Sequence, residues 1–216
     1  MPSPRSRFIA SVTALALLLV AWPALAATVD QAITAQRNRD YKQAIVLWTQ
    51  LIDSGQFSGD KLAIMYYNRG LSHRRTGQLD KAVADYTEAA RLTPQDASIF
   101  NNRGFAYDEQ RKYDLAIADY TRAIQLKPDY ARAYSNRGVA YRKKDRDDLA
   151  IADYNQAIKI DPQYATPYFN RALVYRKRKM YDRAIADVKR FMELNPRHPL
   201  GPRLLAVLQK EQRKKR

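Results

Sequence analysis

The sequence has no cysteine among its 216 residues, so neither a disulfide framework nor a thiolate metal site can form. The two histidines, His73 and His198, cannot build a transition-metal cluster or a cysteine–histidine catalytic pair without cysteine. No glycine-rich phosphate-binding loop occurs. Most carboxylates recur at regular intervals or lie in turns, which is not the pattern of a glycosidase pair. We therefore expect no enzyme activity, no metal and no cofactor.

The N-terminus has the layout of a secretory signal peptide. Arg5 and Arg7 precede an apolar run over residues 8–22, and the triplet Ala24-Leu25-Ala26, with small residues at its first and third positions, precedes Ala27. The run is shorter than the ~20 residues that span a bilayer, which disfavours an uncleaved anchor, although retention of the leader stays open. No later segment is apolar enough to cross a membrane. We expect cleavage after Ala26 and a periplasmic or secreted protein.

The mature chain is strongly basic. Removing Arg5 and Arg7 from the 38 basic residues leaves 36 against 22 acidic ones, a formal charge of +14. Such a balance favours acidic partners or anionic surfaces, and nucleic acid must be weighed as well.

A 34-residue period organises most of the remaining chain. The same short segment recurs at this spacing, as Tyr67-Asn68-Arg69-Gly70, Asn101-Asn102-Arg103-Gly104, Ser135-Asn136-Arg137-Gly138 and Phe169-Asn170-Arg171-Ala172. One alanine and one proline per unit recur likewise, at Ala82, Ala116, Ala150 and Ala184 and at Pro94, Pro128, Pro162 and Pro196. Four full repeats follow, over 63–96, 97–130, 131–164 and 165–198.

Each repeat has the apolar spacing of two helices. Tyr66, Gly70 and His73 step by four and three residues, as do Ala82, Tyr86 and Ala89. A turn around Gly77 separates the two stretches, and the proline near the end of the unit prevents the second helix from continuing. The repeat is therefore a helical hairpin with an apolar side that stacked copies must cover.

These residues closely resemble the tetratricopeptide repeat family over residues 63–198. The resemblance rests on small residues facing each other across the hairpin and on aromatic residues beside them: Gly70, Gly104, Gly138, Ala82, Ala116, Ala150 and Ala184, and Tyr107, Tyr141, Tyr175, Tyr86, Tyr120 and Tyr154. Departures are His73, where tyrosine is typical, and Ala172, Val188 and Phe191 in the last unit. The resemblance implies an all-α, right-handed α-solenoid in a bacterial, non-enzymatic, protein-binding scaffold.

The ends of the stack diverge from the repeat. Residues 27–62 echo the second-helix pattern at Ala44 and Trp48, with a first helix over 30–38 and a longer loop over 53–59, and predict a diverged hairpin. Residues 199–216 predict a capping helix that packs through Leu204, Leu205, Val207 and Leu208, with 209–216 facing water as a basic tail.

The resemblance implies that one side of each first helix lines a concave groove in which extended peptides lie. Helical rotation puts Asn68 about 200° from Gly70, away from the hairpin partner. The candidate groove residues are an asparagine ladder, an apolar strip and a basic flank: Asn68, Asn102, Asn136 and Asn170; Leu71, Phe105, Val139 and Leu173; Arg75, Arg132, Lys143 and Lys177. A carboxamide can bind peptide backbone whatever the partner's side chains.

Structural alternatives remain open for all three sets. The asparagines can bond within the fold, and the apolar residues can be buried between neighbouring first helices. The basic residues favour an acidic segment, but they also suit helix C-termini. The carboxylate clamp of chaperone-tail-binding relatives is incomplete, because Asn102 and Arg132 fit it while Tyr67 and Leu71 do not.

A second repeating set is expected to be structural. Each repeat carries an arginine and, 16 residues later, an aspartate, and we expect bidentate ion pairs across the hairpin: Arg69 with Asp85, Arg103 with Asp119, Arg137 with Asp153 and Arg171 with Asp187.

The competing function is electrostatic binding of polyanions, such as anionic envelope polymers, lipid head groups or nucleic acid. The charge and the tail residues Lys210 and Arg213 to Arg216 support it. Nucleic acid has less support, because nine of the 15 tyrosines fall in columns that the hairpin packing uses. The sequence does not name the partner, points to no small-molecule substrate, and leaves peripheral membrane contact and oligomeric state open.

Overall fold

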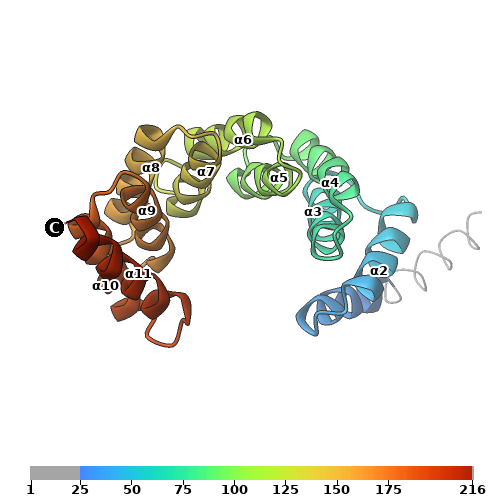
Figure 1. The fold of residues 1–216 in the computed structure, drawn as a ribbon. Coiled ribbons are helices and arrows are strands. Elements are labelled where there is room, and N and C mark those ends of the chain that lie inside the picture. The colour runs from blue at the N-terminus through green and yellow to red at the C-terminus, as the bar shows by residue number, and fades with distance from the viewer. Residues whose placement is uncertain (1–24, 216) are drawn as a thin grey trace, which may run out of the picture. The chain divides into compact units, whose positions relative to one another are not determined.

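A computed structural model describes residues 25–215, so the predicted signal peptide lies outside the described residues except for its last two positions. Every regular element in this described range is a helix, which confirms the prediction of an all-α stack of hairpins (Figure 1). The chain divides into two compact units, Met1–Pro94 and Gln95–Arg216. Among the described helices, none has the length and apolarity needed to cross a membrane.

The first unit contains two hairpins. A helix over residues 25–37 and α2 (Tyr41–Asp53) form the first hairpin, and α3 (Gly59–Arg75) and α4 (Leu79–Leu92) form the second. The buried core of the first hairpin includes Ala32, Ala44, Trp48 and Leu51. The first helix is longer than the predicted 30–38, since it already includes Leu25 and Ala26 and so runs across the predicted cleavage point. Leu25 packs against this core, which gives the extra turn an apolar contact.

The second unit contains three hairpins followed by a single helix. The hairpins are α5 (Ala97–Glu109) with α6 (Tyr113–Leu126), α7 (Ala131–Lys143) with α8 (Asp147–Ile160), and α9 (Ala165–Lys177) with α10 (Tyr181–Leu194). Helix α11 (Leu200–Lys215) follows and packs on α10. Each second helix also contacts the next first helix, so the hairpins form a continuous stack within this unit.

A left-handed residue makes the turn inside each hairpin. The backbone has positive φ at Arg39, Gly77, Arg111, Asp145 and Lys179. The residue after each of these donates its N–H to the carbonyl five positions earlier, as Gln78 does to His73 and Met180 does to Tyr175. This pattern satisfies the exposed carbonyls at the end of the first helix and reverses the chain.

Small residues let the two helices of a hairpin approach closely. A Cβ atom added to Gly104 or Gly138 would lie 3.0 Å or 2.7 Å from the Cε1 atom of the facing tyrosine, Tyr120 or Tyr154. In the last hairpin the first helix carries Ala172 instead, and the smaller Val188 replaces the tyrosine. Both residues are fully buried, so the larger side chain on one helix is matched by a smaller one on the other.

Candidate functional site

The predicted groove residues lie on the first helices of both units. Asn102, Asn136 and Asn170 are half-buried on α5, α7 and α9, and neighbouring first helices of this second unit are in contact. Asn68 is half-buried on α3 in the first unit. The second unit therefore carries three of the four predicted asparagines on the first helices of three consecutive hairpins.

The asparagine amides make hydrogen bonds within the fold. Asn68 donates from Nδ2 to the carbonyl of Ile64 at 2.8 Å, and Asn102 donates to the carbonyl of Ser98 at 2.9 Å. Asn136 donates to Oδ1 of Asn101 at 3.0 Å and so links α7 to α5. The structural alternative therefore applies to these three side chains. A carboxamide has two N–H donors and an oxygen with two lone pairs, so one such bond does not exhaust it.

The predicted apolar strip is half-buried along its whole length, at Leu71, Phe105, Val139 and Leu173. Val139 packs against the cluster that holds Tyr154, and Leu173 packs against the cluster that holds Val188. These side chains are thus neither sealed inside the protein nor fully exposed. They form an apolar floor next to the asparagines.

Two of the four residues of the predicted basic flank form ion pairs between successive repeats. Lys143 Nζ lies 2.5 Å from Oδ2 of the buried Asp108, and Lys177 Nζ lies 2.8 Å from Asp145 and 3.0 Å from Asp147. The hydrogen bond that Lys177 donates to Asp145 raises the pKa of this lysine above its usual range. Carboxylates of the same chain therefore offset the charge of these two lysines, although all four residues of the basic flank are exposed.

Another set of bonds between repeats was not predicted. The residue just after α7 or α9 binds the acidic residue near the start of the preceding second helix, as Lys144 does with Asp114 and Arg178 does with Asp148 at 2.6 Å. Both pairs are 30 residues apart in the sequence. That constant separation of a base from an earlier acid is the signal that could have revealed them.

The four arginine–aspartate pairs are bidentate and mostly buried. Arg103 donates from Nε and from one terminal nitrogen to Asp119, both at 2.8 Å, and the other three pairs have the same geometry. The Asp119 carboxylate raises the pKa of the Arg103 guanidinium, which outweighs the opposing effect of burial. An aromatic ring three residues earlier lies beside each guanidinium, at centroid distances of 5.4 to 5.8 Å.

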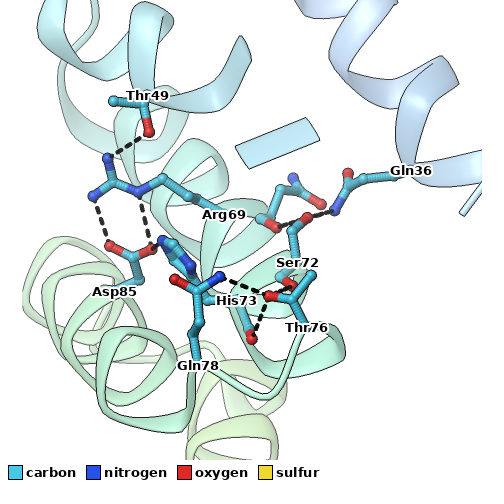
Figure 2. Close-up of polar contacts among 9 residues, drawn as sticks. Gln36, Thr49, Arg69, Ser72, His73, Thr76, Gln78 and Asp85 are labelled. Carbon is cyan, nitrogen blue, oxygen red and sulfur yellow. Dashed lines mark hydrogen bonds and ion pairs between the residues drawn. The ribbon is translucent and has the colours of Figure 1, made fainter. Parts of the chain in front are cut away.

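Three of these arginines also reach the preceding hairpin, which the sequence did not predict. Arg69 Nη1 donates to Thr49 at 3.2 Å, Arg137 to Thr121 at 3.0 Å and Arg171 to Asn155 at 2.5 Å. Figure 2 shows Arg69 between Thr49 on α2 and Asp85 on α4. We call this arrangement of one arginine, its aspartate and the hydroxyl or amide of the preceding hairpin the arginine clamp. It joins three helices.

His73 lies next to the clamp of the first unit. Its Nε2 atom is 3.8 Å from Oδ2 of Asp85, and the residue is 7% exposed (Figure 2). Burial lowers the pKa of His73 below its ordinary value, against the opposing attraction of Asp85. On the other side of α3, Gln36 donates to the carbonyl of Asn68 and to the hydroxyl of Ser72, which ties the first hairpin to the second.

Comparison with protein-family models identifies the same repeat as the sequence period and the structure. A model described as TPR repeat matches residues 70–111, 107–145 and 140–179, and one described as Tetratricopeptide repeat matches residues 165–198. The chain belongs to the tetratricopeptide repeat family. A comparison with curated proteins gave no significant match.

Solved tetratricopeptide structures share the fold. A tetratricopeptide repeat protein from Parabacteroides merdae superposes with a TM-score of 0.75 at 19% identity, over 89% of this chain and 75% of its own. YrrB, described as a TPR protein with an unusual peptide-binding site, has a TM-score of 0.63 at 17% identity, over 82% and 89%. The first TPR of Spaghetti (RPAP3), bound to an HSP90 peptide, has a TM-score of 0.52 at 27% identity, over 54% and 92%.

Proposed function

We propose that this tetratricopeptide protein is a non-enzymatic scaffold that binds an extended segment of a partner protein along α5, α7 and α9. The observation that carries the proposal is the recurrence, on three consecutive first helices, of a half-buried asparagine beside a half-buried apolar side chain. Backbone amides of an extended segment need donors and acceptors at regular intervals, and its apolar side chains need a floor. The repeated pair supplies both.

The chemistry of the surface favours recognition of the partner's backbone over its charge. Because Lys143 and Lys177 are already paired with carboxylates, the exposed Arg132 contributes most of the positive charge among the predicted groove residues of this unit. An acidic residue of the partner near Arg132 would add affinity without dominating it. The peptide-bound RPAP3 module and the peptide-binding site of YrrB support a peptide ligand by analogy of fold.

The proposed place of action is the bacterial cell envelope. The support is the basic, apolar and small-residue succession over residues 1–26, which is typical of an exported protein. The polyanion function has weaker support, because basic residues that follow the groove helices, including Lys144 and Arg178, bind carboxylates of the same chain. Intramolecular pairing of this kind lowers the field that a polyanion would meet.

The test replaces the three asparagines by alanine together, as N102A/N136A/N170A. Peptides are first enriched on the wild-type protein from a random displayed library, and the dissociation constant of a synthetic enriched peptide is then measured. Loss of several hydrogen bonds, each of about 0.5–1.5 kcal/mol, should weaken binding at least about tenfold. The matched control, Gln125→Ala with Gln156→Ala, removes two amides from the second helices α6 and α8 and should leave affinity unchanged.

Unchanged affinity in the triple variant, with an unchanged helical circular-dichroism spectrum, would overturn the proposal. A salt titration separates the two functions. Binding through backbone bonds and apolar contacts should change little as salt rises, whereas polyanion binding should fall steeply.

A further inference from the structure

Helix α11 occupies the place of the first helix in a fourth hairpin of the second unit. Its Leu208 takes the same position in the 34-residue repeat as Ala140 and Val174, and all three residues are fully buried. Its Gln212 binds Asp182 at 2.6 Å, at the 30-residue separation that also joins Arg178 to Asp148. Sequence and contacts both show that α11 docks on α10 as α9 docks on α8.

The bond between Arg176 and Glu211 supports the same register with the charges reversed. Arg176 reaches Glu211 at 2.6 Å over 35 residues, the separation that joins Lys143 to Asp108. The prediction that residues 209–216 simply face water is therefore wrong for Glu211 and Gln212, which are half-buried against the last hairpin.

No second helix covers α11 within the described residues. At the matching position of the earlier hairpins, Asp145 and Lys179 take positive φ and turn the chain back, but α11 continues as helix through Arg213 to Lys215. The missing second helix leaves Ala206 uncovered. This residue takes the same repeat position as Gly138 and Ala172. Ala172 is fully buried beneath α10, whereas Ala206 is exposed.

The uncovered face of α11 has the features of a helix-binding surface. A shallow hollow of about 360 Å³ is lined by Ala206, Gln209, Lys210, Arg213 and Lys214. The small side chain at Ala206 would let another helix come close, as the glycines and Ala172 do in the complete hairpins.

The charge of this face selects its occupant. Lys210, Arg213 and Lys214 are all exposed along one side of it. A second copy of α11 would bring the same cations face to face, which disfavours a symmetric dimer through this surface. Carboxylates on the approaching helix would instead be attracted to these cations. In the last complete hairpin, Ala172 on the first helix packs with Ala184 and Val188 of α10 rather than with a tyrosine, so small aliphatic residues should also fit against Ala206.

We infer that the uncovered face of α11 binds an amphipathic helix of a partner protein, with small aliphatic residues on its contact side and carboxylates beside them. This surface is separate from the asparagine groove and does not depend on it. It would let one scaffold hold an extended segment and a helix at the same time.

The probe is a stapled, fluorescent peptide with the α10 sequence Tyr181–Leu194, in which Arg183, Lys189 and Arg190 are replaced by glutamate. It is titrated with the full-length protein, next to a stapled peptide of unaltered sequence. The acidic peptide should bind at least about tenfold more tightly at low salt. Ala206→Gln places a larger side chain on the uncovered face of α11, and K210E/K214E reverses the charge of that face. Each variant should weaken binding of the acidic peptide at least about fivefold.

The controls separate this site from general attraction to a basic protein. K127E/K159E makes the same charge change at exposed positions next to α6 and on α8, and should leave binding of the acidic peptide within about twofold. The N102A/N136A/N170A variant should also bind it normally, so failure of the groove and failure of this site are distinguishable. Equal binding of the two peptides, no effect of Ala206→Gln, or an equal loss in K127E/K159E would overturn the inference. Dimerisation that Ala206→Gln abolishes would show that the face binds a second copy instead.

Discussion

At the scale of single residues, His73 is the clearest departure from the repeat. It takes the position that tyrosine takes in the next three repeats, at 107, 141 and 175, and it lies buried beside Asp85, Arg69 and Lys81. Because burial lowers the pKa of His73, the folded first unit holds its imidazole neutral over a pH range in which the unfolded chain binds a proton.

This imidazole should make the stability of the first unit depend on pH. As pH falls below the ordinary histidine value of about 6.5, the unfolded state takes up more protons than the folded state, and the free energy of unfolding decreases. We expect wild type to lose more stability than His73→Tyr between about pH 7.5 and about pH 5. Urea unfolding at the two pH values measures the difference, and His198, present in both proteins, serves as an internal control. Equal losses in the two proteins would contradict this account of His73.

Residue-level prediction from the sequence succeeds where the spacing lies within one hairpin. The separation of 16 residues between Arg137 and Asp153 pointed to a bidentate pair because the hairpin brings these two positions together. The third contact of that arginine, to Thr121, could not be predicted in the same way. It depends on how one hairpin sits on the previous one, and the repeat period does not determine that rotation.

At the scale of helices, the arginine clamp is the polar joint of the stack. Arg137 on α7 binds Asp153 on α8 and Thr121 on α6, so one side chain fixes three helices. The side chain of Asp153 is 8% exposed, whereas that of Asp148, in the ion pair with Arg178, is 89% exposed. Their contributions to stability should therefore differ.

We expect Asp153→Ala to lower the free energy of unfolding by about 2–4 kcal/mol, because it leaves a largely buried guanidinium without its carboxylate. Asp148→Ala, the exposed control, should have little measurable effect. Urea denaturation followed by circular dichroism gives both values. Replacing both partners, as Arg137→Met with Asp153→Leu, should cost less than the sum of the two single changes. Similar losses for Asp153→Ala and Asp148→Ala would argue against the clamp.

The helices themselves were predictable because glycine, alanine and proline recur with the period. The charge of the groove was harder to predict from the sequence. Lys143 and Lys177 looked like a basic flank, yet they bind Asp108 and Asp147 of the preceding repeat. Charges that are distant in sequence neutralise each other only once the hairpins are stacked, so a reading of single repeats overestimates the positive field. For α11, the sequence predicts packing on the last hairpin through Leu204 and Leu208, which the structure shows. The repeat register of Ala206 and Leu208 adds that α11 takes the place of a first helix.

At the scale of the whole molecule, the account rests on stacking. Within each unit, every hairpin packs on the previous one and leaves the same side of its first helix partly accessible, so a repeated sequence produces a repeated surface. In the second unit this surface carries Asn102, Asn136 and Asn170 on three consecutive first helices. The protein binding that we propose depends on that surface.

The most direct measurement is hydrogen–deuterium exchange of the full-length protein, with and without a peptide enriched from the displayed library. The account predicts slower exchange in peptic fragments that contain α5, α7 and α9, with α6, α8 and α10 unchanged. Protection confined to the second helices, or spread evenly over the basic surface, would contradict the claim that the first helices form the binding site.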